Sequence, residues 1–558
     1  MARVVLIGPS DSLTPFLAER LASPGSCACR TVQAPSASYE DLLAGGIEAI
    51  VYRPPLAGRK DARPDLADAE RLAAACARYR PRRVVLLSSA AAHAPSHHNT
   101  GFLREDERLR TDHPLADAWL KLEERLTDTG AEVVVLRPAP VAVRDGRDYL
   151  CRLLQGKAAV VPAGYDPSLQ VLHPEDLAEA VRCALERGSG IYHVAPAGVV
   201  PVRGALRLAG TRRVAIDAEA QRPFRALASR LGWADPPAQL DLLRHSTTVS
   251  GRKIEQELGF VPRKTSAEAV RDVFGMGDAP LPDFDPYGMD EGYIDAYGRT
   301  LFPFLHDRYW RIEHQGLENV PLQGRAVLTG VHRGFMPWDG VMALHLLRRE
   351  TGRIPRFLIH PCLIKFPFLA NYMTKLGGII ACQENADWVL EREGLLGMFP
   401  EGIGGAFTMY RDAYKLGRFG RDEYVKMALR NRAPIVPFVT VGSAEIYPIL
   451  FRVESKLVRR VLEWPFLPVT PTFPLPGLPL PSKWHTRFLE PIPVHEQHPP
   501  EAADDPQTVR RISAEVRARM EGAIGEMLER RRSVFFGSVF DLKEERTSAA
   551  APSKRDAV

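Results

Sequence analysis

The sequence predicts an α/β protein with two domains. Its 558 residues exceed what one core usually accommodates. Short β-branched runs alternate with helical patterns in both halves, and the acidic, proline-rich stretch Met276–Tyr287 breaks both periodicities. We therefore expect a first domain over residues 1–275, a linker over 276–290, a second domain over 291–540 and a disordered tail over 541–558.

Each half contains apolar segments of strand length. The expected strands of the first domain are Val4–Ile7, Ala49–Tyr52, Arg83–Leu87, Val133–Leu136 and Gln170–Leu172. The expected strands of the second are Ala326–Thr329, Leu395–Phe399 and Ile435–Val441, with a last helix over Thr508–Arg532. Because helical stretches separate the strands, a doubly wound parallel sheet is favoured in the first domain and a second α/β arrangement in the other.

Composition narrows the classes of function. The formal net charge is only +5 and both signs are interspersed, which argues against a nucleic-acid partner. Seven scattered cysteines favour a reducing compartment. The sequence has no apolar run long enough to span a membrane, and it opens on a strand pattern rather than a leader. We expect a cytoplasmic protein that touches a membrane without crossing it.

A histidine and an aspartate stand close together after the first strand of the second domain. His332 follows Ala326–Thr329, and Asp339 comes seven positions later, beyond Gly334 and Pro337, which turn the chain. A carboxylate that holds a histidine fixes its tautomer and stabilises the imidazolium that forms when the ring accepts a proton. The pair is therefore a candidate catalytic base with its orienting acid.

Two later segments complete a pattern. Phe399-Pro400-Glu401-Gly402 ends one apolar strand, and Ile435-Val436-Pro437 lies in the next. With His332 and Asp339, these segments resemble, in the same order, the phospholipid/glycerol acyltransferase superfamily, which includes lysophosphatidic acid acyltransferases. The resemblance implies a glycerolipid O-acyltransferase of EC 2.3.1 type in phospholipid biosynthesis.

The same resemblance implies roles for the motif residues and for the substrates. His332 is the general base aided by Asp339, and Phe399, Pro400, Glu401 and Gly402 bind the acceptor, although Glu401 could instead be a structural carboxylate. The donor is acyl-CoA or acyl carrier protein, the acceptor is a glycerolipid hydroxyl, and acyl transfer requires no cofactor.

The sequence departs from the family pattern in three places. The spacing from His332 to Asp339 is longer than usual, Gly404 stands where a basic residue is common, and Gln383 lies in a block that often carries an arginine. In the family that the sequence resembles, these arginines hold the acceptor's phosphate, a task suited to the guanidinium fork. Their absence weakens the assignment of lysophosphatidate, and a neutral glyceride remains an alternative acceptor.

Three cations could replace the missing arginines. Arg411, Lys415 and Arg418 follow the Phe-Pro-Glu-Gly motif at short intervals. They are candidate substrate-binding residues, and a solvated basic face is the alternative interpretation. Residues 362–373 and the proline-rich stretch 464–480 combine aromatic and apolar side chains, the latter near Lys456, Arg459 and Arg460. Such mixtures are typical of membrane interfaces, although core or loop packing would also explain them.

The first domain has its own resemblance. Gly8 follows the first strand where a dinucleotide-binding fold carries three glycines, but Asp11 and Thr14 occupy the other two positions. Further segments resemble, in order, the extended short-chain dehydrogenase or NAD-dependent epimerase family. They are Val84–Ser89, Leu136–Val141, His173–Val181 and Leu258–Val270. The resemblance implies a Rossmann-like fold that takes NAD(P), with Gly8, Ser88 and Lys121 as cofactor-binding residues.

The catalytic pair of that family is incomplete here. Its tyrosine stands four residues before a lysine that lowers the phenol's pKa, yet Asp117 stands four residues before Lys121. We therefore expect a degenerate domain that binds a nucleotide loosely or acts as a scaffold. Two alternatives stay open: a bifunctional lipid enzyme with an active oxidoreductase or epimerase domain, and a non-catalytic lipid-binding scaffold.

A short histidine-rich segment follows Ser88 in the first domain. His93, His97 and His98 are close in sequence, but no fourth metal ligand can be placed beside them. We therefore predict a loop and no metal site.

Overall fold

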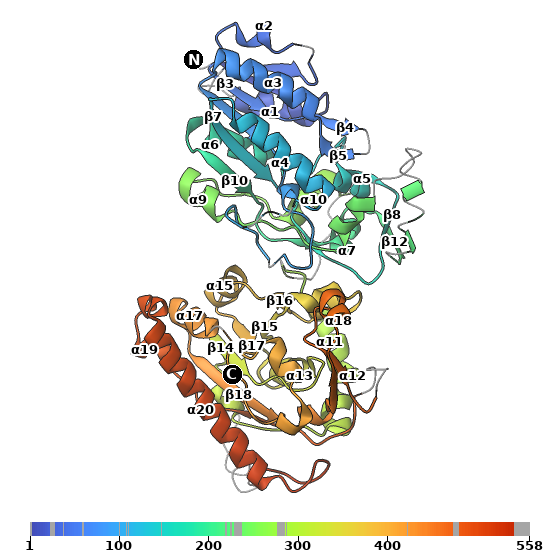
Figure 1. The fold of residues 1–558 in the computed structure, drawn as a ribbon, viewed down its shortest axis with the longest axis vertical. Coiled ribbons are helices and arrows are strands. Elements are labelled where there is room, and N and C mark those ends of the chain that lie inside the picture. The colour runs from blue at the N-terminus through green and yellow to red at the C-terminus, as the bar shows by residue number, and fades with distance from the viewer. Residues whose placement is uncertain are drawn as a thin grey trace, which may run out of the picture. The chain divides into compact units, whose positions relative to one another are not determined.

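The computed structural model divides into two compact units (Figure 1). The first comprises Met1–Asp290 with Leu363–Lys375, and the second comprises Glu291–Cys362 with Leu376–Val558. The structure describes residues 3–540 except 23–27, 37, 59–60, 100, 108, 110, 147, 218–219, 222, 224–225, 228–236, 276–284, 286, 421 and 473–478. The expected tail and most of the expected linker therefore lie outside the described residues.

A six-stranded parallel sheet forms the centre of the first unit. Its strand order is β10-β7-β6-β3-β1-β2. The strands are β1 (Arg3–Gly8), β2 (Ala28–Gln33), β3 (Ala49–Tyr52), β6 (Arg83–Leu87), β7 (Glu132–Pro138) and β10 (Gly190–Val194). The order reverses beside β1, as in doubly wound sheets, and a crevice at the carboxyl ends of the strands follows from such a reversal. The predicted Rossmann-like α/β fold is confirmed.

The alternation of side chains along β1 explains the two helical layers. Val4 and Leu6 pack into a core with α1 (Leu13–Leu21) and α6 (Pro174–Glu186). Val5 and Ile7 point to the other face, where α3 (Leu66–Tyr79) and α4 (Pro114–Thr127) pack. Among the described residues, this unit also has the helices α2 (Glu40–Leu43), α5 (Tyr149–Gln155), α7 (Val202–Leu208), α9 (Arg252–Leu258), α10 (Ser266–Phe274) and α14 (Leu369–Lys375). The described part of the first unit also contains two-stranded sheets. They pair β4 (Leu56–Gly58) with β5 (Asp61–Pro64), β8 (Ala158–Pro162) with β12 (Arg212–Ile216), and β9 (Ser168–Leu169) with β11 (Val200–Pro201).

One expected strand of the first unit is wrong. Residues 170–172 do not join the sheet, and Leu172 makes only an isolated bridge with Val141. Gln170 is buried, and its side-chain amide is satisfied by two hydrogen bonds, of 2.7 and 3.0 Å, with the backbone of Val249. The apolar run therefore reflects burial in a loop rather than pairing in a sheet.

The second unit contains a seven-stranded sheet, ordered β13-β21-β18-β14-β17-β15-β16. Its strands are β13 (Glu313–Gln315), β14 (Ala326–Gly330), β15 (Arg356–Ile359), β16 (Ile379–Ile380), β17 (Leu395–Met398), β18 (Ile435–Val441) and β21 (His485–Phe488). The pairing is parallel except between β18 and β21. The three predicted strands are confirmed as β14, β17 and β18, with β14 paired to both others at the centre.

Helices and a small ribbon surround this sheet. The helices are α11 (Glu291–Arg299), α12 (Leu301–Pro303), α13 (Trp338–Thr351), α15 (Gln383–Glu391), α16 (Ile403–Ala406), α17 (Glu423–Arg430), α18 (Lys456–Val461), α19 (Val494–Gln497) and α20 (Pro506–Arg530). The ribbon pairs β19 (Phe451–Val453) with β20 (Leu467–Val469). The last helix packs against β18 and lies within two residues of its expected bounds.

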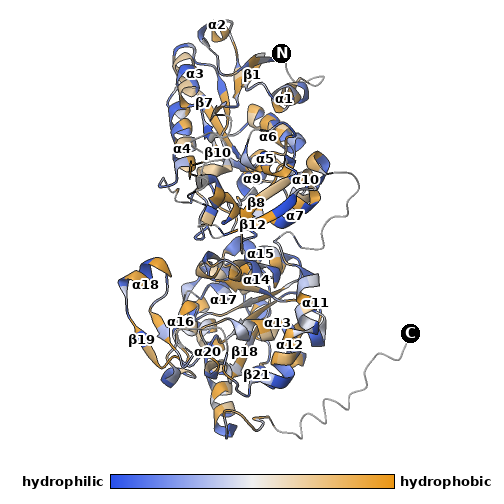
Figure 2. Cartoon of the chain, turned by 90° about the vertical axis from the view of Figure 1, so that its right-hand side faces the viewer, coloured by the Kyte–Doolittle hydropathy of each residue, from blue (hydrophilic) through white to orange (hydrophobic). Residues whose placement is uncertain are grey.

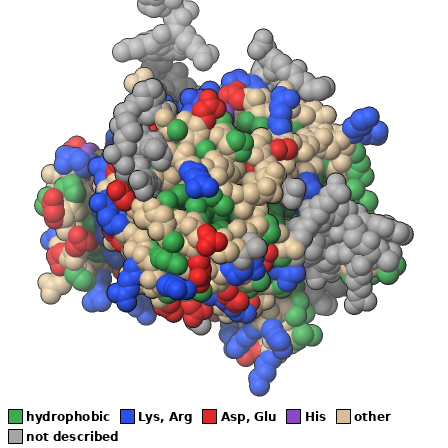
Figure 3. All heavy atoms as spheres, turned by 90° about the horizontal axis from the view of Figure 1, so that it is seen from above, with side chains coloured by type: hydrophobic (Ala, Val, Ile, Leu, Met, Phe, Trp, Pro, Cys, Tyr) green, Lys and Arg blue, Asp and Glu red, His purple; other side chains and the backbone are tan. Residues whose placement is uncertain are grey.

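The surface carries charges of both signs. Lysine and arginine side chains lie among aspartate and glutamate side chains on the face drawn in Figure 3. Within the described part of the chain, none of the helices combines the length and the apolar character that crossing a bilayer requires.

Candidate active site

The expected histidine and aspartate meet at the carboxyl end of the central strand. His332 lies in the loop after β14, and Asp339 lies in the first turn of α13. The His332 Nδ1 is 2.8 Å and 2.9 Å from the two Asp339 carboxylate oxygens. The same carboxylate accepts the backbone N–H groups of Arg333 (2.8 Å) and Gly340 (3.0 Å). Four polar contacts therefore fix the acid.

The turn between the two residues depends on a glycine. Gly334 has a φ of +84°, and a Cβ atom there would lie 2.9 Å from the backbone oxygen of Ser443. A side chain at this position would meet both the left-handed backbone and that oxygen. Gly334 therefore lets the longer loop bring His332 back toward Asp339.

The contact with Asp339 occupies Nδ1 of the His332 ring and leaves Nε2 as the nitrogen that can accept a proton. When Nδ1–H donates to Asp339, the neutral ring carries its lone pair on Nε2. The ring packs on Phe399, with 5.2 Å between centroids, and Phe399 stacks on Phe357 at 5.5 Å. The His332 side chain is 12% exposed, whereas that of Asp339 is fully buried. A histidine held in this way by a buried carboxylate can accept a proton at Nε2.

A buried ion pair links this loop to the Phe-Pro-Glu-Gly motif. The Arg333 guanidinium donates to both oxygens of Glu401, at 2.6 and 3.1 Å, and these side chains are 1% and 4% exposed. Gly417 N–H also donates to Glu401, at 2.5 Å. Glu401 is thus bound within the protein, beside the His332 loop. Of the other motif residues, Phe399 packs against the His332 ring, the Pro400 carbonyl accepts the N–H of Gly420, and Gly402 is the N-cap residue just before α16.

The sequence did not reveal Arg333 as a site residue. Its guanidinium also donates to the backbone oxygens of His332, Ala413 and Lys415, at 2.7, 2.5 and 3.0 Å. A basic residue, Arg333, directly follows His332, and the Phe-Pro-Glu-Gly motif contains the acidic residue Glu401. These opposite charges in two neighbouring motifs were the sequence feature that could have predicted an ion pair.

The three candidate cations lie on the loop that Arg333 binds. The side chains of Arg411 and Lys415 are 81% and 79% exposed, and both pair with Asp412, at 3.4 and 2.9 Å. Arg418 is also exposed. The structure places Arg411 and Lys415 in a local surface cluster around Asp412.

A second buried network lies after β18, and the sequence did not indicate it. The Tyr414 hydroxyl donates to Glu445, at 2.6 and 2.8 Å from its oxygens, and Arg531 donates to both residues. Burial and the charge of Glu445 raise the pKa of the Tyr414 phenol well above its ordinary value. The network fixes the same loop through Tyr414, which lies between Ala413 and Lys415.

The first unit has a cavity at the reversal of its sheet. It measures about 400 Å³ and is lined by residues including Ser10, Asp11, Arg53 and Ser88. Asp11 pairs with Arg53 and also accepts from Thr14, which follows Gly8 in the expected phosphate turn. Burial alone would raise the pKa of Asp11, but Arg53 holds it below its ordinary value. A charged pair therefore lines the cavity at this turn.

The other two predicted cofactor residues, Lys121 and Ser88, have protein partners of their own. Lys121 pairs with Asp117 at 2.8 Å, and both side chains are more than one-third exposed. The Ser88 hydroxyl donates to Glu123 at 2.5 Å, and Glu123 accepts from Arg137 at 2.6 and 2.9 Å. Ser88 lines the cavity, whereas Lys121 is not among the described residues that line it.

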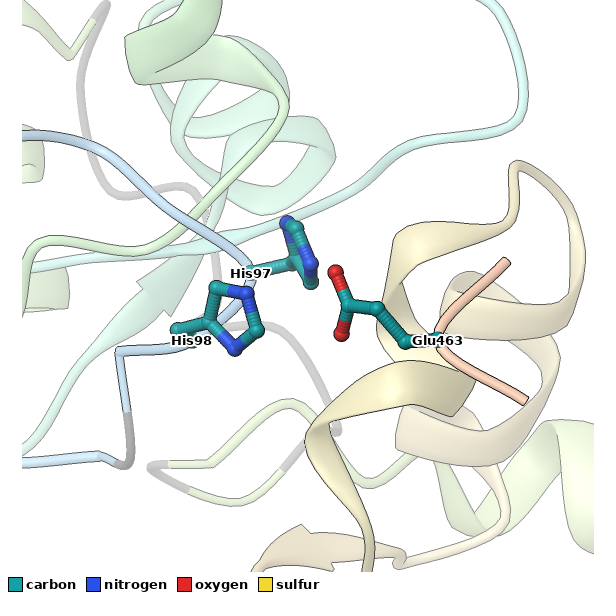
Figure 4. Close-up of side chains that lie close together, drawn as sticks. All are labelled: His97, His98 and Glu463. Carbon is teal, nitrogen blue, oxygen red and sulfur yellow. The ribbon is translucent and has the colours of Figure 1, made fainter. Parts of the chain in front are cut away.

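The three clustered histidines separate into a buried one and a surface pair. His93 Nε2 lies 2.9 Å from His193 Nε2, and burial lowers the pKa of His93 to about 4 and that of His193 to about 2. His97 and His98 lie side by side (Figure 4), and their ring centroids are 4.1 Å apart. Glu463, also drawn there, belongs to the other unit, and we assign no metal site to these side chains.

Comparisons with known proteins identify relatives of this chain. A family model described as Acyltransferase matches residues 311–441. An uncharacterized protein of Mycobacterium tuberculosis (strain ATCC 25618 / H37Rv) is 37% identical over 259 residues, which is 45% of this chain and 72% of the relative. An uncharacterized protein of Mycobacterium leprae (strain TN) is 32% identical over 361 residues, covering 61% and 96% of the two chains.

Other similarities are more distant. The chloroplastic phytyl ester synthase 1 of Arabidopsis thaliana is 26% identical over 286 residues, which is 46% of this chain and 40% of that protein. Among solved structures, MoeE5 with UDP-glucuronic acid and NAD has a TM-score of 0.39 at 18% identity, covering 48% and 96% of the chains. A UDP-glucose 4-epimerase of Thermotoga maritima with UDP-glucose has a TM-score of 0.37 at 15% identity, covering 49% and 97%.

Replacing Arg333 with methionine tests the buried pair. The change leaves Glu401 buried without its partner, and we expect the second unit to lose about 3–5 kcal/mol of unfolding free energy. Lys415→Met, which removes an exposed cation from the same region, should change stability little. Urea titration followed by tryptophan fluorescence measures both. Equal stability of the two variants would contradict the structural role of the pair.

Proposed function

Because the chain belongs to the acyltransferase family through its second unit, we propose that this unit moves a fatty acyl group from a thioester donor to a glycerolipid hydroxyl. The observation that carries the proposal is the His332–Asp339 contact at the end of β14, beside the Arg333–Glu401 pair. The donor is acyl-CoA or acyl carrier protein, and the site of action is the cytoplasmic face of a membrane.

The geometry supports a direct mechanism. Nε2 of His332 removes the proton of the acceptor hydroxyl while the oxygen attacks the thioester carbonyl. The tetrahedral intermediate collapses, the carbon–sulfur bond breaks, and the thiolate takes the proton from the imidazolium. Asp339 holds the ring and stabilises its charged form throughout. Glu401 contributes indirectly, because it holds Arg333, whose backbone N–H in turn holds Asp339.

The acceptor is the least constrained part of the proposal. Gly404 and Gln383 replace basic residues of the family pattern, and Arg411 and Lys415 pair with Asp412 rather than standing unpaired. Both observations favour an acceptor without a phosphate, and the name of the phytyl ester synthase relative is consistent with a neutral alcohol. Lysophosphatidate is the alternative.

We further propose that the first unit is a degenerate dinucleotide fold without oxidoreductase activity. Asp11, at the expected phosphate turn, carries a carboxylate and pairs with Arg53, and Lys121 pairs with Asp117 instead of following a tyrosine. A bifunctional enzyme is the alternative, and the cavity at the sheet reversal is the feature that favours it.

Replacing His332 with alanine tests the base. We expect acyl transfer to fall by about 100- to 10,000-fold because the hydroxyl loses its proton acceptor, while circular dichroism stays unchanged. His498→Ala, at a half-buried histidine of the same unit, serves as the control and should keep full activity. Turnover near the wild-type rate in His332→Ala would rule out His332 as the base.

An acceptor panel tests the substrate class. Radiolabelled acyl transfer should proceed on mono- and diacylglycerol at least as fast as on lysophosphatidate. A strong preference for lysophosphatidate would show that other cations replace the missing arginines. Loss of that preference in Arg411→Gln or Lys415→Gln would then identify them.

Titration with NADH and NADPH tests the first unit. We expect a dissociation constant no tighter than about 1 mM, corresponding to little more than 4 kcal/mol of binding. The variant Asp11→Gly/Arg53→Ala removes the charged pair and should bind more tightly than the wild type. Micromolar binding by the wild type together with turnover would establish the bifunctional alternative.

A further inference from the structure

A segment that projects from the second unit exposes apolar side chains that are not packed in the core. We name residues 450–469 the arm: it leaves the body along β19, turns through α18 and returns along β20. Strands β19 and β20 pair in antiparallel fashion, with Phe451 opposite Val469 and Val453 opposite Leu467. All three side chains of β19 are exposed, and none in α18 is buried. Figure 2 shows β19 and α18 standing clear of the rest of the second unit.

The exposed apolar residues are large and grouped. Phe451 is 69% exposed, Val453 48%, Leu457 68% and Val461 50%. Leu457 and Val461 are four residues apart on α18, so they share one face of the helix. Single exposed apolar side chains are ordinary, but a group of this kind indicates a surface that meets an apolar partner.

Basic side chains accompany this group. The arm carries Arg452, Lys456, Arg459 and Arg460 against only Glu454 and Glu463, a net charge of +2. Lys456 and Arg460 are exposed and stand four residues apart on the same short helix. Apolar side chains beside cations match a bilayer surface that has anionic headgroups over acyl chains.

The base of the arm packs on the active-site loop. Ile449 and Phe466 are buried in a cluster with Ala406 and Phe407, which lie just beyond the Phe-Pro-Glu-Gly motif. Phe335, three residues after His332, packs edge-on against Trp464 with ring centroids 4.8 Å apart. Aromatic and apolar packing therefore joins the arm to the loop that carries His332.

We propose that the arm binds the surface of an anionic lipid bilayer, with Phe451, Leu457 and Val461 entering the interface and Lys456 and Arg460 on headgroups, while Arg452 and Arg459 pair with Glu454. This inference rests on the proposed function, in that a lipid-borne acceptor requires the enzyme at that surface. It locates contact in residues just before the proline-rich stretch 464–480. Within that stretch, Phe466 is buried and Trp464 packs on Phe335, while residues 473–478 lie outside the described residues.

Vesicle co-sedimentation of the full chain in a His332→Ala background measures binding without turnover. The protein should sediment with vesicles of phosphatidylcholine and phosphatidylglycerol, and less with phosphatidylcholine alone. Phe451→Ser/Leu457→Ser should weaken binding at least about tenfold, because two large apolar side chains no longer enter the interface. Lys456→Gln/Arg460→Gln should weaken it about 25-fold on anionic vesicles only, near fivefold for each cation.

Matched controls separate the arm from the general surface. Leu322→Ser removes an apolar side chain that is 69% exposed elsewhere in the unit, and Arg510→Gln/Arg519→Gln removes two cations from α20. Both controls should sediment like the parent. Equal sedimentation of the arm variants, or an arm-dependent change in oligomeric state without any change in sedimentation, would overturn the inference.

A second assay distinguishes this inference from the proposed function. With His332 restored, the arm variants should keep their rate on a water-soluble short-chain acceptor and lose it on an acceptor embedded in vesicles. Loss on both acceptors would assign the arm to the catalytic site itself and overturn the surface role. Absence of transfer by the wild-type chain would overturn the proposed function while the sedimentation result stood.

Discussion

The candidate site depends on the buried ion pair between Arg333 and Glu401. Arg333 binds Glu401 through its side chain and Asp339 through its backbone N–H, and Asp339 in turn holds His332. The ion pair joins the loop after β14 to the loop after β17. These two strands are neighbours in one sheet. Removing one member of a buried pair leaves a desolvated charge, so the pair strongly opposes any separation of the two loops.

A second constraint acts on the same region. The network of Tyr414, Glu445 and Arg531 fixes Tyr414 in place. Tyr414 lies between Ala413 and Lys415, whose backbone oxygens accept hydrogen bonds from Arg333. The loop that carries the candidate acceptor cations is therefore fixed at its backbone while their side chains remain exposed. Aromatic contacts continue from Phe335 to the base of the arm. The structure thus connects the proposed base, the acceptor loop and an exposed surface through direct packing.

The sequence predicted local and central features better than peripheral ones. The strands β14, β17 and β18 were found because buried parallel strands are continuously apolar. Strands β2 and β10 lie at the two edges of the first sheet, and the exposed residues of β2 obscure its pattern. The expected strand over 170–172 was wrong because burial of Gln170 comes from side-chain hydrogen bonds.

The same distinction holds for the site. His332 and Asp339 are seven residues apart, so their contact follows from one turn. Arg333 and Glu401 are 68 residues apart, and Glu445 and Arg531 are 86 apart, so only the adjacency of strands and helices brings them together. Periodicity carries no information about such pairs, which is why the buried networks that hold the candidate base appear only in the folded chain.

Comparing kcat for His332→Ala, Asp339→Asn and the double variant tests the central claim most directly. If the two residues act as one base, Asp339→Asn alone slows acyl transfer strongly, and the double variant is no slower than His332→Ala. Independent, multiplying losses in the double variant, or an Asp339→Asn rate equal to the wild type, would contradict a catalytic dyad.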